Sequence, residues 1–92
     1  MTTSIGAKQL TADGYVNSTN PTRIFNILVL SGGTGATVAL KDANTTTYDT
    51  VKGTANVVVR VNYEGGLLFP GGCYVDVDVN TTSVTVDYES LT

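Results

Sequence analysis

The chain of 92 residues has eight acidic and five basic side chains, a net charge of −3, one cysteine and no histidine. A chain of this length is expected to form one domain, residues 1–92, with a thin core and no room for a deep pocket. The acidic balance disfavours a protein that binds nucleic-acid phosphates, and a single cysteine excludes a disulfide within the chain. No apolar run is long enough to span a membrane, and residues 1–10 lack the apolar core of a signal peptide.

No segment shows helical periodicity, and strand signals recur along the whole chain, as is typical of sandwiches and barrels. Two weak strands are predicted first, at residues 4–10 and 15–18, separated by the turn signal Asp13-Gly14. We therefore predict an all-β fold. The expected architecture is a small antiparallel β-sandwich, jelly-roll or immunoglobulin-like, of about seven or eight strands.

The clearest predicted hairpin covers residues 23–40, with a glycine pair at its tip that supplies the positive φ of a tight turn. Phe25, Ile27 and Val29 alternate on one face of its first strand. The other face is also apolar, so this strand is either covered on both faces by its own chain or meets another chain. The interface candidates on that face are Ile24, Leu28 and Leu30.

The middle of the chain is more polar. Residues 42–53 are rich in threonine and form either a short edge strand at 47–51 or a surface loop. Residues 56–63 follow as a strand with Val57, Val59, Val61 and Tyr63 inward. Glycines then predict a turn at 64–66, and Pro70-Gly71-Gly72 predicts another.

A second hairpin is predicted over residues 73–89, with Cys73 and a series of valines facing inward. Its polar face carries Asp76, Asp78 and Asp87, and the expected register places Asp76 opposite Asp87, where like charges are destabilising. These acids either lie on a solvated face or meet basic side chains of a neighbouring subunit, and a bound metal ion is the weak alternative. We expect no metal. The inward position of Cys73 predicts a buried thiol.

Catalysis is disfavoured because the chain has no histidine to act as a general base or to activate Cys73. The glycine-rich run 31–35 lacks the Gly-Lys-Ser/Thr ending of a phosphate loop. We predict no enzymatic activity and no cofactor. A sugar-binding surface would need exposed tyrosines grouped together; Tyr63 and Tyr88 are expected in the core, which leaves Tyr15, Tyr48 and Tyr74.

Four stretches resemble short virion structural proteins of tailed bacteriophages, including cyanophages. They are Arg-Ile-Phe-Asn-Ile-Leu-Val at 23–29, Gly-Gly-Thr-Gly-Ala-Thr-Val-Ala-Leu-Lys-Asp at 32–42, Gly-Leu-Leu-Phe-Pro-Gly-Gly-Cys-Tyr-Val at 66–75 and Ser-Val-Thr-Val-Asp-Tyr at 83–88. Together they span most of residues 20–90. The resemblance implies a small β-sandwich, often trimeric, in a capsid decoration, head-fibre or connector role, with no catalytic residues.

On this basis we expect a non-enzymatic capsid decoration (cement) protein, assembled in the bacterial cytoplasm and located in the virion. It would bind the major capsid protein or another virion protein as a homotrimer, and it would bind neither nucleic acid nor a membrane. The alternative is a receptor- or carbohydrate-binding module of a tail or head fibre, or a connector or tail component.

Overall fold

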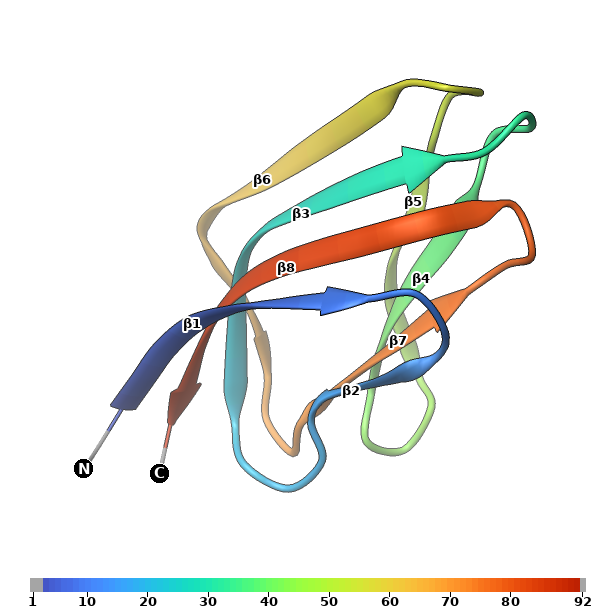
Figure 1. Cartoon of the computed structure of the whole chain (residues 1–92). Coiled ribbons are helices and arrows are strands. Elements are labelled where there is room, and N and C mark those ends of the chain that lie inside the picture. The colour runs from blue at the N-terminus through green and yellow to red at the C-terminus, as the bar shows by residue number, and fades with distance from the viewer. Residues whose placement is uncertain (1–2, 92) are drawn as a thin grey trace.

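The computed structural model describes residues 3–91, which form eight strands in two four-stranded antiparallel sheets (Figure 1). One sheet has the order β1-β8-β3-β6 and the other β2-β7-β4-β5. The strands are β1 (Thr3–Leu10), β2 (Gly14–Asn17), β3 (Thr22–Ser31), β4 (Thr37–Asp42), β5 (Thr47–Lys52), β6 (Val58–Phe69), β7 (Cys73–Val77) and β8 (Thr81–Leu91). The predicted all-β sandwich is confirmed. Among these residues there is no helix of the length and hydropathy needed to cross a membrane.

The strands pair in a nested order, in which the first strand pairs with the last and the two middle strands pair with each other. β1 pairs with β8, β2 with β7, β3 with β6 and β4 with β5, each pair antiparallel. The chain is therefore one long hairpin, with its tip between β4 and β5, rolled so that successive pairs fall in alternate sheets. This eight-stranded, two-sheet arrangement is the jelly roll, one of the two expected types.

Both predicted local hairpins are wrong. β3 and β4 lie in different sheets, so residues 32–36 cross between the sheets and do not form a tight hairpin turn. Val29 lies opposite Val59 and Val84. β7 and β8 are also in different sheets. Alternation correctly shows which side chains face the core, but two strands in opposite sheets share that core as readily as two neighbours do.

The predicted turn at residues 64–66 is also wrong, because β6 continues through it. Gly65 and Gly66 have φ of 77° and 85°, and they bend β6 without reversing it. A Cβ atom on Gly66 would overlap the Arg23 side chain, so glycine is required there for space as well as for conformation. The edge strand expected around 47–51 is present as β5.

A bulge in β3 accompanies this bend. Ile24 lies opposite Tyr88, but Asn26 lies opposite the next residue of β8, Asp87, so Phe25 is the extra residue. The bulge reverses the alternation along β3. Ile24 consequently faces the same side as Ile27, and both side chains are 0% exposed.

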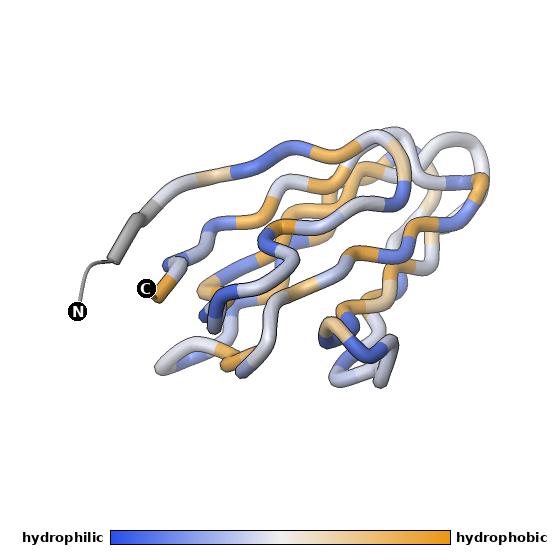
Figure 2. Tube along the Cα trace, turned by 90° about the horizontal axis from the view of Figure 1, so that it is seen from below, coloured by the Kyte–Doolittle hydropathy of each residue, from blue (hydrophilic) through white to orange (hydrophobic). Residues whose placement is uncertain are grey.

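The core lies between the inward faces of the two sheets, and the apolar and polar residues alternate along the strands that cover it (Figure 2). Phe69 is the largest fully buried side chain, and Tyr48 stacks on its ring with 4.7 Å between the centroids. Cys73 is fully buried, and burial raises the pKa of its thiol to about 12. The predicted buried thiol is confirmed. Tyr63 and Tyr88 pack against the core as expected.

Polar bonds tie the two sheets together along their edges. The Tyr63 hydroxyl on β6 donates to Asp49 Oδ2 on β5 at 2.6 Å. Burial, together with this hydrogen bond, raises the pKa of Tyr63. On the other side, Lys8 Nζ on β1 donates to the backbone oxygen of Tyr15 on β2 at 2.6 Å. The inward-directed charge of Lys8 protects an edge strand against unwanted pairing.

Candidate interaction surfaces

The outer face of the β1-β8-β3-β6 sheet is the first candidate surface, and we call it the leucine face. Ile27 and Val29 on β3 and Val84 and Val86 on β8 are fully buried, so the residues that alternate with them point outward. The same alternation applies to β6, where Val61 packs against the core. On these three strands the leucine face consists of Arg23, Asn26, Leu28, Leu30, Val58, Arg60, Asn62, Leu68, Thr85, Asp87 and Glu89.

An apolar stripe follows β3 on the leucine face. Leu28 and Leu30 are half-buried there, and Val58, which lies opposite Leu30, is 49% exposed. Two of the three apolar interface candidates are therefore on the outer surface. Ile24 is not: it is part of the chain's own core, and its assignment to this face is corrected by the bulge at Phe25.

The charges of the leucine face differ in whether the chain pairs them. Arg23 Nη1 lies 3.1 Å from Glu89 Oε1 and forms an ion pair. Arg60 on β6 and Asp87 on β8 flank β3 on opposite sides, and among the side chains that the structure describes, those of residues 6–91, neither has an ion pair or a hydrogen bond. Sequence reasoning selected Asp87 and missed Arg60, although the alternation of residues 58–61 already indicated that Arg60 points outward.

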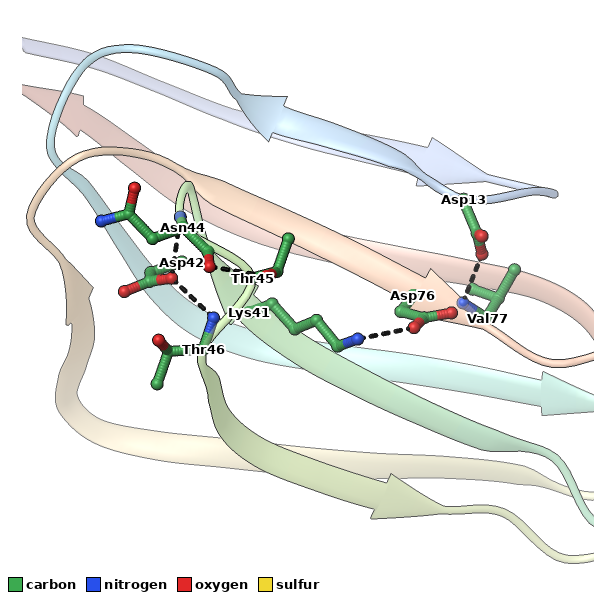
Figure 3. Close-up of polar contacts among 8 residues, drawn as sticks. All are labelled: Asp13, Lys41, Asp42, Asn44, Thr45, Thr46, Asp76 and Val77. Carbon is green, nitrogen blue, oxygen red and sulfur yellow. Dashed lines mark hydrogen bonds and ion pairs between the residues drawn. The ribbon is translucent and has the colours of Figure 1, made fainter.

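The outer face of the β2-β7-β4-β5 sheet is the second candidate surface, the tyrosine face, made of Tyr15, Lys41, Tyr74 and Asp76. Asp76 lies opposite Ala39 and not opposite Asp87, which is in the other sheet. Lys41 Nζ donates to Asp76 Oδ2 at 2.9 Å (Figure 3). That hydrogen bond raises the pKa of Lys41. The sequence left open whether Asp76 lies on a solvated face, meets a base or holds a metal ion, and in the structure it meets Lys41 of its own chain.

Asp78 has a local role at the end of β7. Its carboxylate accepts hydrogen bonds from Thr37 N at 2.9 Å, Asn80 N at 3.1 Å and Thr81 Oγ1 at 3.0 Å. Burial acts to raise the pKa of Asp78, but these hydrogen bonds outweigh it and lower the pKa. The next residue, Val79, was expected to face inward and is 96% exposed, because β7 ends before it.

The three predicted acids therefore do not form one cluster. Asp76 is on the tyrosine face, Asp78 is in a turn and Asp87 is on the leucine face. Among the described side chains, no three acidic, histidine or cysteine residues come together in a way that could hold a metal ion. The weak metal alternative has no site in this part of the chain.

Two tyrosines do come together on the tyrosine face. Tyr15 and Tyr74 lie opposite each other on β2 and β7, with ring centroids 4.9 Å apart and an edge-to-face angle of 67°. Tyr15 is 41% exposed and Tyr74 is half-buried. Burial, and the nearby negative charge of Asp13, raise the pKa of Tyr74.

A shallow depression lies at one end of the sandwich, between the β1–β2 and β7–β8 connections. Asp13 and Asp78 are its acidic lining residues. Asp13 Oδ1 accepts a hydrogen bond from Val77 N at 2.7 Å (Figure 3), and Asp78 is bonded as described above. Both carboxylates thus serve to hold the two connections in place.

No protein-family model matches the sequence, and no curated protein sequence matches it. A subunit of Bacillus endospore appendages, described as a novel family of disulfide-linked pili, has a similar structure, with a TM-score of 0.59 and 9% identity over 99% of this chain and 88% of that one. A chain of the virus-like particle of the extra small virus of the giant freshwater prawn Macrobrachium rosenbergii gives a TM-score of 0.46 and 8% identity, over 97% and 77%. At 9% identity, the likeness to the appendage subunit concerns the fold alone.

Proposed function

We propose that this protein is a non-enzymatic structural subunit that acts by binding other protein subunits in a particle. The observation that carries the proposal is the leucine face, an outward surface with half-buried leucines and two unpaired charges of opposite sign. No buried side-chain nitrogen or oxygen of the described residues lacks a hydrogen-bond partner, so the unpaired charges of the leucine face lie at the surface, where another protein can meet them.

The fold is compatible with this role. The appendage subunit with a similar structure belongs to an assembled fibre, described as disulfide-linked. In the present chain Cys73 is fully buried, so it is not placed to form a link between subunits. Assembly would rest on non-covalent contacts.

The specific role we propose is capsid decoration in a tailed bacteriophage. The protein would bind the major capsid protein, or another virion protein, on the head surface as a homotrimer, after synthesis in the bacterial cytoplasm. Each copy offers only a small patch, and a multivalent oligomer multiplies weak contacts through effective concentration. Binding to the intact shell alone would stabilise that shell by mass action.

The test is reconstitution on phage heads from which the protein has been stripped. The purified protein should rebind the heads, and the temperature at which they release DNA should rise. Leu28→Asp should reduce binding, whereas Lys52→Asp, an exposed position on β5 in the other sheet, should not. Wild-type protein that fails to bind stripped heads would contradict the decoration role.

Absence of catalysis is part of the same proposal. Asp76 is paired with Lys41 and Asp78 holds a turn, so neither carboxylate is arranged as a free acid or base. Reproducible hydrolysis of a glycan or ester that is lost on Asp76→Asn would overturn this part.

Carbohydrate recognition is the second candidate function, and the Tyr15–Tyr74 pair favours it. Two aromatic rings with a neighbouring carboxylate could combine an apolar contact with hydrogen bonds to sugar hydroxyls. A glycan array should then show binding that Tyr74→Ala abolishes. Tyr48→Ala is the matched control, since Tyr48 stacks on Phe69 away from that pair.

A further inference from the structure

We propose that the leucine face is where copies of this chain bind one another, with Leu28 and Leu30 packed around the axis of the oligomer and Arg60 of one copy paired with Asp87 of the next at each joint. This inference rests on the proposed homo-oligomer and identifies its surface.

The width of the apolar stripe determines how the copies would meet. Leu28 lies between Arg60 on β6 and Thr85 on β8, so the apolar surface is one strand wide at that level. Packing two whole sheets flat against each other would also remove the polar amides of Asn26 and Asn62 from water, which costs free energy. A ring of copies around an axis parallel to β3 buries the apolar stripe at the axis. The polar side chains of β6 and β8, on either side of the stripe, then lie at the joints, where one copy meets the next.

The two unpaired charges fit that ring. Neighbouring strands lie about 4.8 Å apart, so β6 and β8 are separated by about 10 Å across β3. Arg60 is level with Leu28 and Asp87 is level with Asn26, an offset of two residues or about 7 Å along the strand. Rotation about an axis along β3 brings β6 of one copy toward the β8-β1 side of the next, where Asp87 lies opposite the small side chain of Ala7 on β1. The long Arg60 side chain can then reach the carboxylate of Asp87 at every joint.

Symmetry makes this pairing self-complementary. Every copy carries both charges, so a closed ring uses each Arg60 and each Asp87 once and leaves none unpaired. The tyrosine face lacks this property because Lys41 and Asp76 are already paired within the chain. Each joint would be smaller than the roughly 800 Å² per partner of a standard interface. Association should therefore depend on protein concentration and weaken as salt rises.

The experiment is a charge-reversal cycle on the full chain, followed by sedimentation velocity over a range of concentrations. Arg60→Asp and Asp87→Arg should each weaken association by about tenfold or more, because each places like charges at the joint. The double variant should return to within about threefold of the wild type. Lys52→Asp is the control for a charge change on the other sheet and should associate normally.

Folding is checked by thermal melting at a concentration where all variants are monomeric. If a reversal lowers the melting temperature, the neutral variants Arg60→Gln and Asp87→Asn replace it. They should still weaken association and reduce its dependence on salt.

Three results would overturn the inference: a wild type that stays monomeric up to its solubility limit, single variants that associate normally, or a folded double variant that is not rescued. These failures are separable from failure of the proposed function. Copies that associate through this face but do not bind phage heads would contradict the decoration role only. A monomer that binds heads would contradict this inference and the proposed homotrimer, and would leave the decoration role standing.

Discussion

The leucine and tyrosine faces are the outer surfaces of two similar sheets, yet they use their charges differently. On the tyrosine face the chain pairs Lys41 with Asp76 across neighbouring strands. On the leucine face Arg60 and Asp87 are separated by a strand of leucines, and neither has a partner among the described residues. An exposed charge thus indicates a binding surface only once the strand order shows whether its own chain already neutralises it.

The largest expected effect contrasts two residues of β3. Ile24→Asp would bury an unpaired carboxylate in the core, which costs several kcal/mol out of a total stability of about 5–15 kcal/mol for a domain. We expect the circular dichroism spectrum of an unfolded chain. Leu28→Asp changes the leucine face, so the variant should keep its β-sheet spectrum and lose only association. A well-folded Ile24→Asp would show that Ile24 points outward.

Cys73 lies in the core between the two sheets, so the reactivity of its thiol measures how well that core excludes solvent. Since its side chain is 0% exposed, a thiol reagent should reach it only after unfolding. Labelling of the native protein should be about a thousandfold slower than in denaturant, or slower still. Rapid native labelling would contradict the buried position.

The same thiol predicts a pH dependence. Its pKa rises from 9.0 to about 12 on folding, so the folded state favours the neutral thiol. The stabilisation is complete below pH 9 and is lost as the pH rises from 9 to 12. Urea unfolding at pH 8 to 11 should show a smaller loss of stability for Cys73→Ala than for the wild type. Equal slopes would argue against the raised pKa.

A smaller effect is expected where the two sheets are joined. Tyr63→Phe removes the hydrogen bond to Asp49 and keeps the ring that packs against the core. The free energy of unfolding should fall by about 1–2 kcal/mol in urea titrations, because Asp49 Oδ2 loses its donor. Tyr15→Phe is the matched control. A neutral Tyr63→Phe would mean that water replaces the lost donor without cost.

The smallest effect should come from the tyrosine face. Lys41→Met breaks an ion pair between partly exposed groups, and such pairs contribute little to stability. Melting temperature and association should both match the wild type within error. Arg60→Met, the same change on the leucine face, should leave melting unchanged but weaken association. If the two variants weaken association equally, the distinction between the faces is wrong.

The sequence alone determined the class of fold and much of what lies inside. Period-two alternation and glycine-rich breaks predicted a β-sandwich, and Cys73 and Val75 of the predicted inward series are fully buried. The reason is local: a strand exposes alternate side chains to opposite sides whatever its neighbour is. The same rule placed Leu28 and Leu30 on the face opposite to that of Ile27 and Val29, and Asp87 on the face opposite to that of Val84 and Val86.

Only the tertiary structure decided which strands are neighbours. The predicted hairpins joined strands that are adjacent in sequence, but the jelly roll places β3 beside β6 and β8 and moves β4 to the other sheet. Alternation shows which face of its strand a side chain lies on, but it does not show which strand lies next to it. The predicted pairing of Asp76 with Asp87 therefore could not be tested from the sequence, and neither could the face of Ile24. The bulge at Phe25 shifts the alternation by one residue, and the pairing of β3 with β6 brings Arg60 level with Leu28. Both depend on contacts between residues far apart in the chain, which short-range patterns do not encode.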